Sequence, residues 1–212
     1  MTERQIRMED VIIRKGEPKD AQDFSRLVLL SAPIFFPYLF GSDVRNVMKN
    51  LFQHTRNYFS FEHSHFIEVN GDIAGMALVY NYKQKKQERL RTGLLLLKYL
   101  KRNMFTQEAY LLRSESILTQ IGERDCYLSN IAVYPDFRGL ELGTKLLGLI
   151  QEETRETGNR RVVLDAETDN KRAIKLYERL GYNIEQKSPI FQIKEKSSEF
   201  FKMCQNCDGN VA

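Results

Sequence analysis

Residues 131–143, IAVYPDFRGLELG, decide the fold of this chain. The stretch begins as the end of an apolar strand at 126–133, turns through residues 135–139, and opens a helix. The apolar residues of that helix fall on one face: Leu142, Leu146, Leu149 and Ile150. The first amides of a helix have no acceptor within it and carry the positive end of its dipole. The segment therefore predicts a phosphate-binding turn, where Gly139 and Gly143 let a ligand approach the backbone.

Two better-known phosphate motifs do not fit this turn. A dinucleotide-binding strand–turn–helix carries GxGxxG near an early strand with an acidic residue about 20 positions later, and that pattern is absent. A P-loop, GxxxxGK[ST], is also absent, because Thr144 and Lys145 follow Gly143 in the reverse order and the first glycine is missing.

A second unit follows the first. Residues 161–166 (RVVLDA) form a nearly continuous apolar run, which is typical of a strand buried on both sides. Residues 170–180 then predict an amphipathic helix that Gly181 ends. Further strands are expected at 182–186 and 199–204, before a polar tail at 205–212.

Together these segments resemble the GNAT superfamily of N-acetyltransferases. IAVYP with Arg138, Gly139 and Gly143 is similar to that family's hydrophobic-Ala-Val-x-Pro run and its Gln/Arg-x-x-Gly-x-Gly/Ala motif, except that Glu141 stands where a glycine is usual. TDNKRAIKLYERLGY (168–182) resembles the later motif, Asn-x-x-Ala-x-x-Leu/Phe-Tyr-x-x-x-Gly-Phe/Tyr. The matching residues of that motif are Asn170, Ala173, Leu176, Tyr177, Gly181 and Tyr182.

The resemblance implies a single α/β domain over 1–212, with a mixed sheet whose two central parallel strands splay apart. It implies direct transfer of an acetyl group from acetyl-CoA, without a metal, to an amine acceptor that is a small molecule or a peptide. Tyr177 is the candidate catalytic residue, as a donor to the departing thiolate, and the amide around Val133 is the candidate oxyanion donor. The cofactor-binding residues it implies are Ile131, Ala132, Val133, Arg138, Gly139, Leu140, Glu141, Leu142, Gly143, Thr144, Asn170, Ala173 and Tyr177.

A catalytically idle coenzyme A-binding or partner-binding domain on the same fold is the alternative. Glu141 favours it, because a carboxylate would stand near the expected pyrophosphate. Asn170 and Tyr177 favour an enzyme.

The composition predicts a soluble globular protein, and the cysteines predict a reducing cytoplasm. Hydrophobic content is 42%, charged residues make up 28%, and the net charge of +4 does not argue for nucleic acid. The polar start MTERQIRMED predicts no signal peptide, and no apolar run approaches the roughly 20 residues of a membrane span. Three cysteines make no disulfide framework, and Cys204-x-x-Cys207 lacks two further metal ligands at a recognised spacing. We interpret those two as ordinary thiols near a frayed terminus, and a homodimer is left open.

The N-terminal half matches the family only in its order of elements. A strand at 10–14, a helix after Pro18, a second helix at 42–54 and a hairpin at 65–69 and 73–80 around Asn70-Gly71 are expected. Residues 81–120 form a basic helical insertion. Acceptor specificity is expected from this insertion and from 31–41 (SAPIFFPYLFG), whose aromatics suit either an apolar groove or a core corner. The basic residues favour a solvated helix face over a guide for anionic substrates, a membrane or nucleic acid.

No general base is identifiable from the residues. Glu123 and Asp125 precede the central strand, and Glu68 and His65 lie in the hairpin. We expect each of them to be a solvated surface group, and we expect His63 and His65 to share an exposed strand face.

Overall fold

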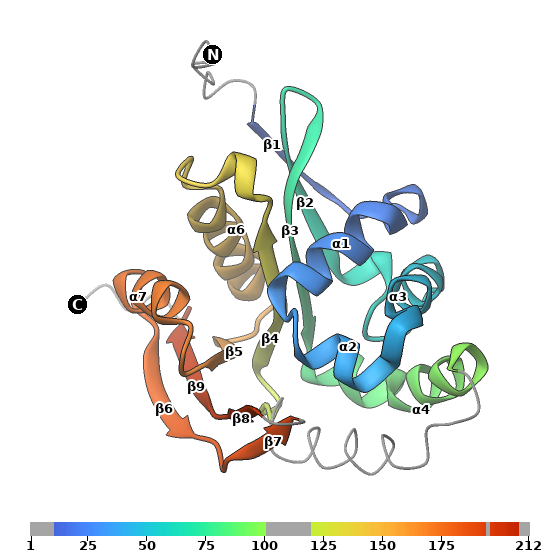
Figure 1. The fold of residues 1–212 in the computed structure, drawn as a ribbon. Coiled ribbons are helices and arrows are strands. Elements are labelled where there is room, and N and C mark those ends of the chain that lie inside the picture. The colour runs from blue at the N-terminus through green and yellow to red at the C-terminus, as the bar shows by residue number, and fades with distance from the viewer. Residues whose placement is uncertain (1–10, 101–119, 194–195, 208–212) are drawn as a thin grey trace.

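A computed structural model describes residues 11–100, 120–193 and 196–207 (Figure 1). Seven strands form one sheet in the order β1-β2-β3-β4-β5-β9-β6. They are β1 (Val11–Lys15), β2 (Ser64–Val69), β3 (Asp72–Asn81), β4 (Asp125–Val133), β5 (Arg161–Glu167), β6 (Asn183–Lys187) and β9 (Phe200–Asn206). Only β4 and β5 pair in parallel among these neighbours. The mixed α/β fold predicted from the sequence is therefore confirmed.

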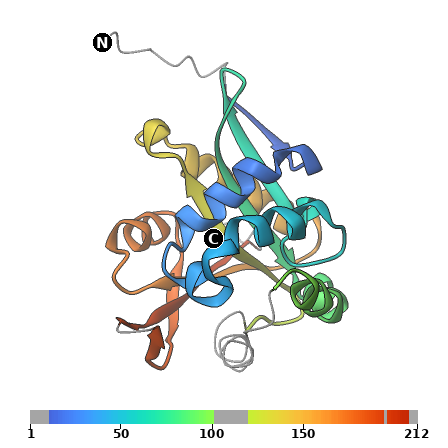
Figure 2. The ribbon, with the colours of Figure 1, turned by 45° about the vertical axis from the view of Figure 1, so that its right-hand side comes forward.

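Helices cover both faces of the sheet (Figure 1). On one face lie α1 (Ala21–Ser31), α2 (Phe35–Phe40), α3 (Val44–Gln53) and α4 (Tyr82–Tyr99). On the other lie α6 (Leu142–Glu156) and α7 (Lys171–Arg179). Phe66 of β2 packs with the first group and its neighbour Ile67 with the second, as the alternation of a strand requires. In Figure 2, α1 and α3 lie together over the first face. Phe24 of α1 stacks on Phe52 of α3, with the ring centroids 4.3 Å apart.

Local sequence signals placed most of these elements. Asn70 and Gly71 both take positive φ angles, 54° and 83°, as a tight two-residue hairpin turn requires. Pro18 begins a 3₁₀ turn, Pro18–Asp20, which leads directly into α1. Asn81 and Gln84 form a reciprocal capping box at the start of α4. The helical character predicted for the insertion is thus confirmed for Tyr82–Tyr99, and residues 101–119 lie outside the described part.

A β-bulge in β4 marks the point where the two central strands, β4 and β5, separate. Leu78 of β3 pairs with Asn130 and Val79 pairs with Leu128, so Ser129 is the extra residue of β4. Parallel pairing of β4 with β5 runs only from Asp125↔Arg161 to Tyr127↔Val163, although both strands continue well beyond it. A bulge bends its strand and increases its twist, so β4 turns away from β5 from this point. The expected splay is confirmed.

The closed end of the splay is held by an ion pair. The Arg161 guanidinium donates from Nε and Nη2 to the two Asp125 oxygens, each at 2.9 Å. Asp125 is 3% exposed, so the expectation of a solvated carboxylate was wrong. Burial acts to raise its pKa, but the hydrogen bonds from Arg161 and the Gly122 amide outweigh burial and lower the pKa.

The expectation for the histidines was wrong as well. His63 ends a 3₁₀ turn, Phe61–His63, and contacts Glu88 of α4 at 2.7 Å. His65 lies in β2 and contacts Glu153 of α6, so the two rings face opposite sides of the sheet. Both are buried, and burial together with Lys15 lowers the pKa of His65. Helices cover both faces of the sheet, so polar residues of its inner strands are buried and paired. Glu68 is half-buried against Arg14, and Glu123 is exposed.

Two smaller expectations needed correction at the C-terminal end, and some short elements were not predicted. β9 continues to Asn206, so the polar tail does not begin at 205, and residues 208–212 lie outside the described part. Cys204 is buried within β9, at a register position between β5 and β6, and is not near a frayed end. A short hairpin of β7 (Phe191–Ile193) and β8 (Lys196–Ser198) and the short helix α2 were not predicted.

Within the described residues no single helix is both long and apolar enough to cross a membrane. Two helical segments joined at a bend of 111°, Pro18–Ser31 and Phe35–Gln53, meet that test of length and composition only as a pair.

Candidate active site

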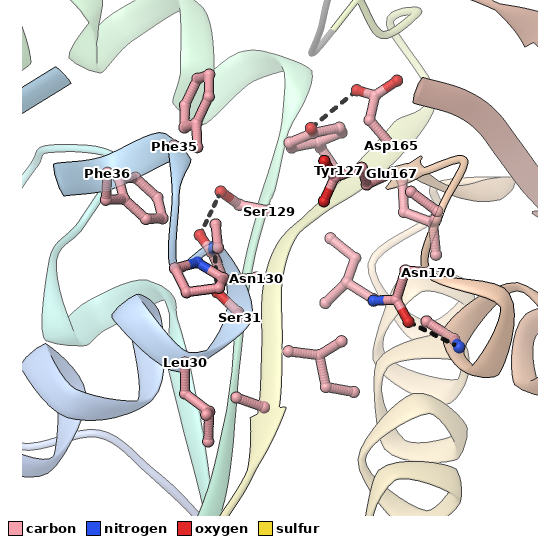
Figure 3. A pocket seen from close by; sticks show the side chains of 18 of the residues that line it. Leu30, Ser31, Phe35, Phe36, Tyr127, Ser129, Asn130, Asp165, Glu167 and Asn170 are labelled. Carbon is pink, nitrogen blue, oxygen red and sulfur yellow. Dashed lines mark hydrogen bonds between the residues drawn. The ribbon is translucent and has the colours of Figure 1, made fainter. Parts of the chain in front are cut away.

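A cleft of about 1560 Å³ opens where β4 and β5 part (Figure 3). Its walls come from both helical layers, because the splay leaves a passage through the sheet. We call the part beside α6 and α7, where the family resemblance predicts the cofactor, the coenzyme arm. We call the part beside α2 and α4, where the sequence predicts acceptor specificity, the acceptor arm. Figure 3 shows Phe35 and Phe36 on one side of the cleft and Asn170 on the other.

The coenzyme arm begins at the N-terminus of α6. Gly139 has a φ of 89°, which an L side chain rarely adopts, and a Cβ built there would meet no atom within 4 Å. A Cβ at Gly143 would find only Leu176, at 3.7 Å. The backbone before and within the first turn of α6 is therefore open to a ligand. Of the thirteen residues predicted to bind the cofactor, all but Leu140 line the cleft, and Leu140 instead packs against the core beneath α6.

Glu141 is the N-cap residue of α6 and takes a left-handed conformation, φ 56° and ψ 16°. A left-handed residue other than glycine is strained, which gives a conformational reason for a glycine at this position. The Glu141 side chain is exposed and lines the cleft. The departure from the family pattern therefore affects the backbone as well as the charge.

The open edge of β4 supplies a second set of backbone groups. The Tyr134 amide donates to Ala74 of β3 at 2.8 Å, so this amide faces β3. Amides alternate between the two edges of a strand, so those of Val133 and Ile131 face away from β3 and toward the cleft. A linear ligand lying along this edge can pair with β4 as another strand would.

The helix α7 contributes Asn170 and Tyr177. The Asn170 side chain accepts from the Ala173 amide at 3.2 Å and so caps the helix. Tyr177 lies two turns later, lines the cleft, and is 7% exposed. Burial raises the pKa of Tyr177 to about 12, so its hydroxyl stays protonated across the physiological range. Among the described residues, none forms a hydrogen bond with that hydroxyl.

Sequence reasoning missed a row of cations on α7. Arg172, Lys175 and Arg179 are exposed and all line the cleft. Their spacings of three and four put them on one face of the helix. That spacing stood inside the segment that matched the family motif and could have revealed the row. Three cations beside the amide-rich start of α6 make this arm suited to phosphates.

Two carboxylates in the acceptor arm were also missed. Asp165 and Glu167 lie two residues apart on β5 and therefore leave the same face of the strand. The Tyr127 hydroxyl donates to Asp165 at 2.9 Å (Figure 3). The Ser198 hydroxyl donates to Glu167 at 2.9 Å. Both carboxylates line the cleft. The sequence did not indicate these two carboxylates because the apolar run of β5 predicted a strand buried on both faces. The splay instead opens one face of β5 to the cleft.

The acceptor arm is otherwise mostly apolar. Phe35 and Phe36 line it, and Phe36 also packs in the core, so the two interpretations of residues 31–41 both describe part of the structure. A short polar chain crosses the floor of the arm. Asn130 donates to the Ser31 hydroxyl at 2.8 Å and accepts from Ser129 at 2.9 Å.

The helix α4 forms the outer wall of the acceptor arm. Leu90, Leu94 and Leu97 line the cleft while remaining 76%, 58% and 62% exposed. Lys86 and Arg89 of this helix also line the cleft. The basic residues of the insertion therefore do more than form a solvated face remote from the site.

No group of three histidine, cysteine or acidic residues in the described ranges has the arrangement of a metal site. Cys204 is buried and the Cys207 thiol contacts the Gln205 carbonyl at 3.8 Å.

Comparison with known proteins assigns the fold and site to a class. The model of the Acetyltransferase (GNAT) family matches residues 33–182, which is more than half of the chain. The chain belongs to this family of acetyltransferases. Transfer of an acetyl group from acetyl-CoA to an amine is general to the family.

Individual relatives are distant. An N-acetyltransferase of Staphylococcus aureus Mu50 superposes with a TM-score of 0.67 at 18% identity, over 92% of this chain and all of that one. The Salmonella typhimurium protein yncA, determined with its cofactor acetyl-CoA, superposes with a TM-score of 0.56 at 16% identity, over 96% and 97% of the two chains. N-alpha-acetyltransferase 30 of Schizosaccharomyces pombe is 34% identical over 56 residues, which are 26% of this chain and 37% of that protein.

Proposed function

We propose that this protein transfers the acetyl group of acetyl-CoA directly to the nitrogen of an amine. One observation carries the proposal: the open edge of β4, the start of α6 and the Tyr177 hydroxyl all line the same cleft. The general activity of the family and the cofactor in the yncA structure support it.

The residues of the coenzyme arm fit acetyl-CoA. Amides at 138–144 and the cations Arg172, Lys175 and Arg179 would hold the phosphates, since both groups favour negative charge. The edge amides of Ile131 and Val133 would pair with the amide-bearing arm of the coenzyme. Glycines at positions 139 and 143 leave the backbone there open to the coenzyme.

The bound coenzyme supplies an activated acyl group as a thioester. The amine nitrogen, once deprotonated, attacks the thioester carbonyl; the C–N bond forms and the C–S bond breaks. The products are the N-acetyl amide, the free thiol and one proton released to solvent. A backbone amide near Val133 that faces the cleft would stabilise the oxyanion formed in this step.

Tyr177 acts as a hydrogen-bond donor to the departing sulfur. Its pKa of about 12 lies above that of an ordinary thiol, about 8.5, so full transfer of its proton is uphill by roughly three pKa units. A hydroxyl that stays protonated still stabilises a thiolate by donating a hydrogen bond. We therefore assign Tyr177 the role of donor, with the proton for the thiol arriving from water.

Calorimetry with acetyl-CoA and a thiol-release assay with a panel of amines and peptides test the proposal together. We expect binding in the micromolar range and release of thiol that depends on the acceptor. Binding without turnover for any acceptor would identify the non-catalytic alternative. No detectable binding at millimolar acetyl-CoA would exclude both.

A further inference from the structure

The acceptor arm has a distribution of charge that selects its ligand. Asp165 and Glu167 stand at its inner end, on the β5 face that also carries Val163 and that packs beside Tyr127. Carboxylates within a cleft attract an ammonium group and hydrogen-bond to it strongly. Its cations, Lys86 and Arg89, stand on α4, where both side chains are exposed.

An apolar row follows these cations along α4. Leu90, Leu94 and Leu97 recur at spacings of four and three, so they occupy one face of the helix. Their Cα atoms span about 10 Å along the axis. Ile34, 42% exposed, lines the cleft from the segment before α2. Large exposed apolar side chains that gather in a cleft mark a binding surface.

The row of leucines on α4 favours a hydrocarbon chain over a peptide as the ligand. A peptide brings one amide N–H and one carbonyl per residue, and each loses stability if it is buried without a partner. The three leucines offer no hydrogen-bonding group. A hydrocarbon chain needs none, and its affinity rises with each methylene that is buried.

We propose that the acceptor is a primary monoamine on a hydrocarbon chain, bound with its ammonium group at Asp165 and Glu167 and its chain against the α4 leucines. This inference rests on the proposed acetyl transfer and names the acceptor for that same site. The carboxylate pair holds the ammonium group in place, and the nitrogen gives up one proton to solvent before its lone pair forms the C–N bond. A diamine is disfavoured because its far ammonium group would lie against the α4 leucines, which offer it no hydrogen-bonding partner.

Matched acceptors test the assignment. The values of kcat/KM for n-hexylamine, n-propylamine, hexane-1,6-diamine and an alanine-initiated peptide are compared at saturating acetyl-CoA. We expect n-hexylamine to exceed each of the other three by at least about tenfold. A diamine or peptide that equals or exceeds n-hexylamine overturns the inference and leaves acetyl transfer standing, whereas the absence of turnover with every acceptor overturns both.

Substitution of Leu94 checks the position of the chain. Leu94→Gln is expected to lower kcat/KM about fivefold for n-hexylamine and less than about twofold for n-propylamine. It should weaken binding of the product N-hexylacetamide, measured by calorimetry, by a similar factor. Ile12→Thr is the matched control, because Ile12 has the same exposed fraction, 58%, and lies on β1 outside the cleft lining. Equal effects of Leu94→Gln on both amines, or no change in product binding, would overturn the placement.

Discussion

The Tyr127 hydroxyl donates a 2.9 Å hydrogen bond to the Asp165 carboxylate and so joins the last paired residue of β4 to the β5 residue two positions beyond its own last pair. Burial, reinforced by the charge of Asp165, raises the pKa of Tyr127 well above its usual value, so the donor keeps its proton. The bond holds one carboxylate of the acceptor arm in place at the apex of the cleft.

Removing this hydroxyl should loosen the acceptor arm. Tyr127→Phe is expected to lower the free energy of unfolding by about 2 kcal/mol, the range for a hydrogen bond to a charged group. It should lower kcat/KM for the amine about tenfold, because Asp165 loses its fixed orientation. Tyr58→Phe is the control, since Tyr58 also lines the cleft but donates to the Lys85 carbonyl, at 3.0 Å. The activities of the two variants are compared on samples that urea titration shows to be equally folded. Equal losses of activity would contradict a role for the Tyr127–Asp165 bond.

Glycine at position 141 should improve both stability and coenzyme binding. Glu141→Gly relieves a left-handed backbone, so the free energy of unfolding should rise by about 1 kcal/mol in urea titrations. It also removes a carboxylate from the cleft, so acetyl-CoA should bind more tightly in calorimetry. Arg56→Gly separates the two effects, because Arg56 has a similar φ of 58° outside the cleft lining and should gain stability alone. An unchanged affinity for acetyl-CoA in Glu141→Gly would show that the carboxylate points away from the phosphates.

The role of Tyr177 predicts a specific kinetic change. Tyr177→Phe should lower kcat about tenfold and leave KM for acetyl-CoA unchanged, because only the donor to the departing sulfur is lost. The pKa of Tyr177 is about 12, so its hydroxyl keeps its proton between about pH 7 and pH 9. Over this range the rate of the wild type and the rate of the variant should therefore depend on pH in the same way. Tyr182→Phe, at a buried tyrosine whose ring centroid lies 5.6 Å from that of Tyr177, should retain activity. Full turnover by Tyr177→Phe would remove the residue from the mechanism.

The cations of α7 should act through charge. Lys175→Gln is expected to raise KM for acetyl-CoA about fivefold at low salt and by less in about 0.5 M salt, because salt screens an exposed phosphate contact. The KM for acetyl-pantetheine, which has no phosphates, should not change. Lys171→Gln, on the same helix but outside the cleft lining, serves as the control. An equal effect on both thioesters would contradict a phosphate contact.

The ion pair at the closed end of the splay predicts the response to acid. The pKa of Asp125 is lowered in the fold, so its stabilising contribution is complete above its usual pKa of about 3.9 and is lost as pH falls through the lowered value. Arg161→Gln should lower the free energy of unfolding by about 2 kcal/mol at neutral pH and by little once Asp125 is protonated in both states. Lys187→Gln breaks the more exposed pair with Glu199 and should change stability by less than about 0.5 kcal/mol.

Much of the coenzyme arm followed from local sequence. The turn at 135–139, the helix that starts at Leu142 and the Asn170 cap depend on residues within a few positions of one another, so a linear pattern predicts them. The same locality placed the hairpin at Asn70-Gly71. The resemblance to the GNAT family rests on these patterns, and the match over residues 33–182 shows the membership.

The acceptor arm was decided by tertiary structure. The splay depends on a bulge where Leu78 and Asn130, far apart in the sequence, come into register, and no local pattern announces it. Because β4 turns away there, Asp165 and Glu167 of an apparently buried strand face a cleft. Tertiary contacts likewise bury His65, against Glu153 of α6, and Asp125, against Arg161 of β5, and no local pattern predicts either contact. The sequence by itself determined the turn and the helices that fit a coenzyme, and long-range strand pairing alone decided which side chains would meet the acceptor, because burial is a property of the assembled layers.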